Sequence, residues 1–93
     1  MSLLPDNKLI VVVLLEPEAR KEFDALPVVI RARVLKIFER LAEWPDVSGA
    51  KALKGEWAGH HRIRTGDWRV IFHVVSPRVI VVRIKHRSEV YED

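Results

Sequence analysis

The residues in this sequence best suited to chemistry are cations gathered in its second half. Between His60 and Arg87, Asp67 is the single acidic residue among seven basic ones: Arg62, Arg64, Arg69, Arg78, Arg83, Lys85 and Arg87. An arginine guanidinium is a planar fork of donors that stays charged and binds two phosphate oxygens at once. Several such groups on adjacent strands would hold a phosphodiester and stabilise the charge that develops at its phosphorus. The pattern favours a polyanion such as nucleic acid, and the alternative is a solvated basic face without a ligand.

Proton transfer on such a substrate needs other side chains, because arginine cannot act as a base. The candidates nearby are Lys85, His86, Glu89, Tyr91, His60 and His73. His86 is in register with apolar residues of its strand, so a role as a half-buried structural histidine is as well supported as a role in proton transfer. Tyr91 either packs on the sheet edge or offers an aromatic ring on which a base stacks. Neighbouring His60 and His61 would point to opposite faces of a strand, so we predict neither a metal site nor a cofactor.

Two helices are predicted between a first strand and the basic half of the chain. Residues 8–15 are β-branched and apolar at successive positions, which predicts a strand buried on both faces or nearly so. Glu16 and Pro17 suit the start of a helix, and apolar residues follow at helical spacing. A second amphipathic helix is predicted over residues 28–43, before Pro45. Both apolar stripes indicate core packing.

Three strands are predicted to follow, at residues 56–64, 68–75 and 78–86. The first two are joined by a tight turn at Gly66, and the last two by a turn at Pro77. Alternation in the strand at 68–75 directs four side chains toward the helices: Trp68, Val70, Phe72 and Val74. Strict alternation in the last strand places Val79, Val81, Arg83 and Lys85 on one face and Ile80, Val82, Ile84 and His86 on the other.

The predicted fold is α+β, with a two-helix hairpin packed on one face of a four-stranded, mainly antiparallel sheet in the order β-α-α-β-β-β. The other face is expected to be open, since 93 residues supply enough core to cover only one face. Trp57 and Trp68 are predicted to lie in the core. The open face would collect Arg62, Arg64, Arg69, Arg83, Lys85 and Arg87.

Composition bounds the remaining possibilities. A chain of 93 residues with 48% hydrophobic and 31% charged residues predicts one globular domain, residues 1–93. The absence of cysteine excludes disulfides and thiolate chemistry. The longest apolar run, residues 9–15, is too short to span a membrane and has no signal-peptide flanks, so we expect a cytoplasmic protein. Residues 1–50 carry 7 Lys/Arg and 8 Asp/Glu, whereas residues 51–93 carry 9 and 5.

The hairpin HHRIRTGDWRVIFHV at residues 60–74 and the ending VVRIKHRSEVY at residues 81–91 together resemble the RelE/ParE superfamily of type II toxins. The resemblance covers essentially the whole chain and implies a single RelE-like toxin domain, monomeric when alone and neutralised by a cognate antitoxin. RelE-like members cut mRNA on the ribosome by activating a ribose 2′-OH to attack the adjacent phosphate. ParE-like members share the fold and inhibit DNA gyrase, and a degenerate relative would only bind its antitoxin.

The resemblance also assigns roles to individual residues. Arg69 matches the arginine that holds the scissile phosphate, and Lys85 stands where RelE has a second catalytic arginine. His86, Arg87 and Tyr91 match catalytic residues of the tail. The residues expected to contact RNA are Lys54, Arg62, Arg64 and Arg83.

Lys85 departs from the family pattern, because a lysine lacks the bidentate fork of an arginine. An ammonium crowded by arginines could have a lowered pKa and serve as a base. The basic tail with Tyr91 favours the ribonuclease branch over the gyrase branch.

Overall fold

The computed structural model describes residues 10–90, so Tyr91 lies outside the described residues. Two helices and five strands are present along this range, together with two short 3₁₀ segments. Their order is β1 (Val12–Leu15), α1 (Pro17–Asp24), α2 (Val28–Leu41), β2 (Lys51–Ala52), a 3₁₀ turn at Gly55–Trp57, β3 (His61–Thr65), β4 (Trp68–Val75), β5 (Arg78–His86) and a 3₁₀ turn at Arg87–Glu89.

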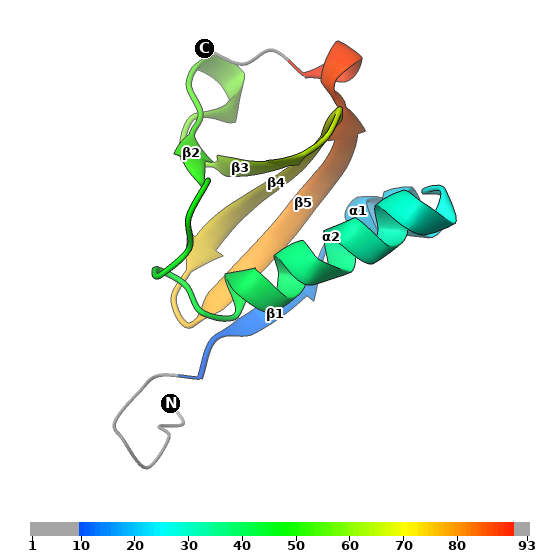
Figure 1. Cartoon of the computed structure of the whole chain (residues 1–93). Coiled ribbons are helices and arrows are strands. Elements are labelled where there is room, and N and C mark those ends of the chain that lie inside the picture. Colours follow the sequence, from blue (N-terminus) through cyan, green and yellow to red (C-terminus); the bar gives the residue numbers. More distant parts are fainter. Residues whose placement is uncertain (1–9, 91–93) are drawn as a thin grey trace.

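The strands form one sheet in the order β1-β5-β4-β3-β2, with the two helices together on one side of it (Figure 1). β1 runs parallel to β5, and every other neighbouring pair is antiparallel. The predicted α+β class and helix hairpin are therefore confirmed. The sheet has five strands rather than four, because the two residues of β2 are too few to leave a pattern in the sequence.

The helices form where the apolar spacing predicted them. Pro17 occupies the first turn of α1, where its missing N–H costs nothing. In α2, Val34, Ile37 and Leu41 recur at spacings of three and four and are at most 3% exposed. Phe23 and Phe38 join the two helices, with ring centroids 5.7 Å apart.

Two strand predictions need correction. Of the strand predicted at residues 8–15, residues 8 and 9 lie outside the described range and the strand itself begins at Val12; Val12 and Leu14 are 44% and 43% exposed rather than buried. β1 is an edge strand, and the helices cover only one of its faces. The strand predicted at 56–64 begins at His61, because residues 55–57 form a 3₁₀ turn that starts at Gly55 with φ +65°.

A β-bulge in β5 corrects the predicted alternation of the last strand. Ile71 of β4 lies opposite Arg83, whereas the next residue, Phe72, lies opposite Val81. Val82 is therefore an extra residue in the ladder, and the faces switch on passing it. Val81 and Ile84 both enter the main core despite their opposite parity, and they are 0% and 2% exposed.

The sheet face away from the helices is less open than predicted. Leu53, Ile71 and Val82 form a second, smaller buried cluster on it, against which Trp57 and Val90 pack. The chain between α2 and β3 is long enough to fold back over this face. Trp68 packs against the main core, so each tryptophan predicted to be buried packs against a cluster.

Candidate nucleic-acid interface

Three cations lie side by side across three adjacent strands. Arg64 of β3 is directly opposite Arg69 of β4, which in turn is directly opposite Lys85 of β5. We call these three residues the cationic row. Directly opposed side chains share a face and have Cβ atoms about 5 Å apart, and like charges so placed repel each other. Such a row is stabilised by an anion, either from a ligand or from the protein itself.

The guanidinium of Arg69 is held in place by its own hairpin. It donates from Nη1 to the carbonyl oxygen of Gly66 at 3.1 Å and to that of Trp68 at 3.3 Å. Gly66 can present its carbonyl there because glycine tolerates the φ of +58° that the turn requires. Arg69 is only 7% exposed, whereas Arg64 beside it is exposed. The row therefore combines a fixed cation with an accessible one.

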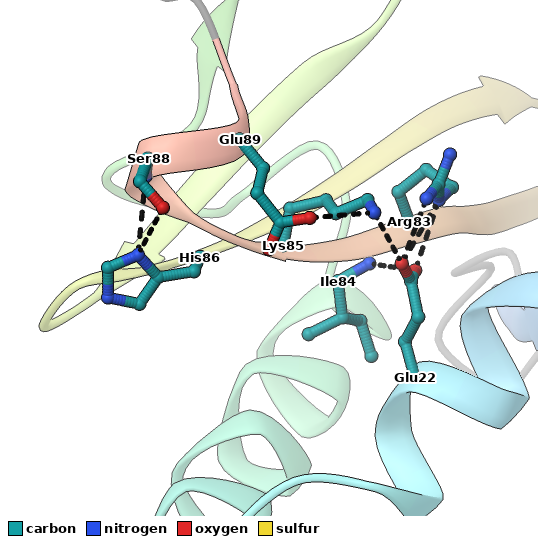
Figure 2. Close-up of polar contacts among 7 residues, drawn as sticks. All are labelled: Glu22, Arg83, Ile84, Lys85, His86, Ser88 and Glu89. Carbon is teal, nitrogen blue, oxygen red and sulfur yellow. Dashed lines mark hydrogen bonds and ion pairs between the residues drawn. The ribbon is translucent and has the colours of Figure 1, made fainter.

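The β5 end of the row is connected to helix α1 through Glu22 (Figure 2). The Glu22 carboxylate accepts hydrogen bonds from Arg83 Nε at 3.1 and 3.2 Å, from Arg83 Nη2 at 3.0 Å and from the Ile84 backbone N–H at 2.8 Å. Lys85 Nζ lies 3.2 Å from the same carboxylate and 3.1 Å from that of Glu89. Two basic residues with predicted roles in RNA binding and catalysis thus share one internal carboxylate.

This cluster keeps its members charged. Burial raises the pKa of Glu22, but hydrogen bonds from Arg83, the Ile84 backbone and Lys85 outweigh it, so the pKa of Glu22 is lowered. The hydrogen bond to Glu89, together with the attraction of Glu22, raises the pKa of Lys85 despite its partial burial and the repulsion from Arg83. The expectation that neighbouring arginines lower the pKa of Lys85 is therefore wrong, because two carboxylates outweigh them.

His86 caps the 3₁₀ turn at Arg87–Glu89. Its Nδ1 accepts a hydrogen bond from the Ser88 backbone N–H at 3.3 Å and lies 2.9 Å from Ser88 Oγ. Its ring stands perpendicular to that of Trp68, with centroids 5.4 Å apart. When the ring is neutral, acceptance at Nδ1 leaves the proton on Nε2. The geometry matches the structural interpretation of His86 and leaves Nε2 for any proton transfer.

Three further residues with predicted roles, Arg87, Arg62 and Lys54, are not members of the row. Arg87 is exposed and approaches Asp67 of the β3–β4 turn, with 3.5 Å between Nε and Oδ1. Arg62 is 5% exposed, in the row that also holds Lys51, Ile71 and Arg83. Lys54 is exposed at the start of the 3₁₀ turn. The predicted roles of these residues stay predictions.

Glu22 was missed from the sequence. It lies three residues after the buried Ala19 and beside Phe23, where a helix that faces a core usually carries an apolar residue. A carboxylate at such a position must be paired when it is partly buried. A glutamate at a core-facing position of the helix was therefore the signal in the sequence that could have identified this residue. The basic residues of the strands supply the cations that pair with it.

Other features of the described chain do not contribute to the row. A hollow of about 590 Å³ lies at the far end of the sheet, lined by residues such as Trp44, Pro45, Pro77 and Val79 and by none of the predicted site residues. Within residues 10–90, His, Asp and Glu side chains do not gather into a group of three that could hold a metal. Neither α1 nor α2, the helices of this range, is long and apolar enough to cross a membrane.

Solved structures with the same fold define the class of protein. The toxin–antitoxin complex RelBE2 of Mycobacterium tuberculosis contains a chain 28% identical to this one, with a TM-score of 0.73 over 86% of this chain and 94% of that chain. The RelB–RelE antitoxin–toxin complex of Methanococcus jannaschii gives 25% identity and a TM-score of 0.68, over 82% and 92% of the two chains. The isolated RelE toxin of Escherichia coli, at 18% identity and a TM-score of 0.69 over 82% and 83%, shares the fold.

The sequence assigns the family. A family model described as the ParE toxin of the type II toxin–antitoxin system parDE matches residues 13–91. The chain therefore belongs to the ParE toxin family, within the RelE/ParE superfamily of type II toxins, and the predicted superfamily is confirmed. A search among curated proteins found no significant match.

Proposed function

We propose that this toxin is a RelE-like, ribosome-dependent mRNA endonuclease. The observation that carries the proposal is the cationic row, in which Arg64, Arg69 and Lys85 come from three adjacent strands. A row of fixed and accessible cations suits a phosphodiester that gains negative charge during attack. The carboxylates of Glu22 and Glu89 neutralise part of the row in the free protein and leave Lys85 charged.

We assign the following roles to the residues of the row and of the tail. Arg69, oriented by two turn carbonyls, would hold the scissile phosphate, and Arg64 would contact the adjoining backbone. The ribose 2′-oxygen would lose its proton to a base, bond to phosphorus and displace the 5′-oxygen, which takes up a proton as it leaves. Lys85 would stabilise the pentavalent phosphorus as a cation, because its raised pKa disfavours the free amine that a base requires. His86 through Nε2 and Tyr91 remain the proposed groups for proton transfer.

Cleavage of a translated message tests the proposal. The lone chain would be expressed inducibly, and primer extension would map the ends of a translated mRNA. We expect cuts within the reading frame that disappear in Arg69→Ala. Arg78→Ala is the matched control, because Arg78 is an exposed arginine at the opposite end of β5. An Arg69→Ala variant that still cut mRNA and arrested growth would overturn the proposal.

Inhibition of DNA gyrase is the second candidate function. The observation that favours it is the ParE description of the family model that matches residues 13–91. This function predicts growth arrest with intact message, and inhibition of DNA supercoiling when purified toxin is added to purified gyrase. A degenerate toxin would instead accumulate in the folded state without any growth arrest.

We also propose that a cognate antitoxin binds this chain, and that the toxin acts in the cytoplasm and is monomeric when alone. The relatives from M. tuberculosis and M. jannaschii were solved as toxin–antitoxin complexes. This chain exposes apolar side chains on β1 and along α2 that a partner would cover: Val12, Leu14, Val28, Val29 and Leu35. Copurification of the toxin with the product of the adjacent reading frame, followed by light scattering, measures the partner and the stoichiometry.

A further inference from the structure

Glu22 connects helix α1 to the strand that carries Lys85, across more than 60 residues of sequence. β1 ends at Leu15, opposite Val81, whereas β5 continues to His86. Beyond β1 the outer edge of β5 has no neighbouring strand within the described residues. The backbone N–H of Ile84 on this edge is satisfied by the Glu22 carboxylate at 2.8 Å.

The negative charge of Glu22 has a role beyond accepting the hydrogen bond from the Ile84 N–H. A neutral glutamine would also offer an oxygen to the Ile84 N–H, although its hydrogen bond is weaker than that of a carboxylate. The negative charge instead serves Arg83, bound through two nitrogens, and Lys85. The Glu22 side chain is only 18% exposed, so its hydrogen bonds to charged groups are shielded from water.

The ammonium of Lys85 is held by two carboxylates of different exposure. Glu22 lies on a regular helix, whereas Glu89 is 52% exposed and lies in a short 3₁₀ turn. The other charged groups that face Lys85 are Arg83 on its own strand and Arg69 directly opposite on β4, and both repel it. Without Glu22, repulsion would drive the ammonium away from the row toward Glu89 and solvent.

We propose that Glu22 is a positioning residue that holds the charged ammonium of Lys85 at the end of the cationic row, and that an RNA phosphate replaces Glu89 rather than Glu22. The inference rests on the proposed ribonuclease function and deepens it. An ammonium has three N–H donors, so Lys85 keeps its bond to Glu22 and turns the others to the phosphate. Glu22 itself does not contact the substrate.

The matched pair Glu22→Gln and Glu18→Gln tests the role. Glu18 lies one turn earlier on α1 and is exposed, and it acts on Arg83 by charge alone. Its variant therefore removes the same charge from the same helix, whereas the ion pairs of Lys85 are with Glu22 and Glu89. We expect Glu22→Gln to slow mRNA cleavage about tenfold or more, as for the loss of a charged hydrogen bond, and Glu18→Gln to stay within about twofold of the wild type. Equal cleavage rates in the two variants would overturn the proposal.

Titration of the Lys85 side chain by NMR gives a readout that a merely structural role would not move. We expect Glu22→Gln to lower the pKa of Lys85, and Glu18→Gln to leave it unchanged. If the wild type does not cleave mRNA, the proposed function fails while this titration still tests the anchor. An unchanged Lys85 pKa in a folded Glu22→Gln protein would reject the anchor.

A measurement on the wild type covers the case in which Glu22→Gln does not fold. An all-deoxy tetranucleotide supplies phosphodiesters and has no 2′-OH to react. On its addition we expect the NMR signals of the Lys85 and Glu89 side chains to shift while that of the Glu22 carboxylate stays in place. A shift at Glu22 with none at Glu89 would contradict the proposed exchange of partners.

Discussion

At the scale of single residues, the imidazole of His86 has two candidate roles, one structural and one in proton transfer. Its Nδ1 accepts the Ser88 N–H and so caps the 3₁₀ turn, while its Nε2 is one of the groups that we propose for proton transfer. Asparagine separates the two roles, because its side-chain oxygen is among the best acceptors at a cap but it cannot carry a proton between oxygens.

We expect His86→Ala to lower the free energy of unfolding by about 0.5–2 kcal/mol through the lost cap, and His86→Asn to recover most of that loss. Urea unfolding measures both variants, and primer extension on a translated mRNA measures their cleavage. If His86→Asn restores stability and cleavage together, the imidazole is structural. Restored stability with cleavage still lost would make Nε2 a catalytic atom.

The sequence indicated the cations of the site but not what they contact. Arginine and lysine types, with period-two spacing, predicted that Arg69 and Lys85 share a face, and the register confirms it. The partner of Lys85 could not be predicted in the same way, because Glu22 is distant in sequence and its approach depends on how α1 crosses β5. For the same reason the direction of the Lys85 pKa was wrongly expected.

At the scale of elements, the bulge at Val82 decides which residues of β5 enter the core. Strict alternation would bury either Val81 or Ile84, whereas both are buried against the helices. The extra residue therefore lets one strand bury apolar side chains at both ends of the core and still direct Arg83 and Lys85 to the other face.

This assignment predicts the cost of truncating individual side chains in β5. Ile84→Ala should lower the free energy of unfolding by about 2–5 kcal/mol, as for a fully buried isoleucine. Ile80→Ala should cost less, because Ile80 is only half-buried on the other face. Urea denaturation of the two variants checks the order. Equal losses for Ile80 and Ile84 would mean that the strand follows simple alternation, which places both side chains on one face.

The contact between α1 and β5 makes stability depend on pH. The pKa of Glu22 is lowered in the folded protein, so its contribution is complete above the ordinary value of 4.5 and is lost as pH falls through the folded value. The pKa of Lys85 is raised, so its contribution is complete below 10.5 and is lost as pH rises through its folded value. The contact is therefore strongest between these limits.

The stability difference between wild type and Glu22→Gln should follow this window. We expect wild type to be more stable by about 1–3 kcal/mol at pH 7, as for a hydrogen bond to a charged group, and the difference to shrink in acid below about pH 4.5. Urea unfolding of both proteins from pH 3 to pH 8 measures it. A constant difference across that range would show that the charge of Glu22 does not stabilise the fold.

The boundaries of elements were predictable where turn residues mark them and not elsewhere. The strands at 68–75 and 78–86 were predicted with the bounds that the structure shows, since Gly66 and Pro77 punctuate them. The segment at 51–57 was not, because its two-residue strand and 3₁₀ turn are held by packing of Leu53 and Trp57 on the sheet rather than by a local pattern.

At the scale of the whole molecule, the chain divides into a near-neutral half and a basic half. The helices belong to residues 1–50, and the cationic row belongs to residues 51–93, whose nine Lys/Arg exceed their five Asp/Glu. A field of one sign on the sheet would attract any polyanion over a distance set by salt. The row adds a short-range component, since its cations are fixed relative to each other by the strand register.

Salt dependence separates these two components. Binding of an all-deoxy oligonucleotide, measured by fluorescence anisotropy, should weaken with a slope of about −2 in log K against log salt if the three cations of the row each neutralise one phosphate. Arg64→Ala should reduce the magnitude of that slope by about 0.7. Arg78→Ala should leave it unchanged, because Arg78 lies at the other end of β5. If the two variants changed the slope equally, the whole basic half would bind as a diffuse surface, and the alignment of three strands would have no special part in recognition.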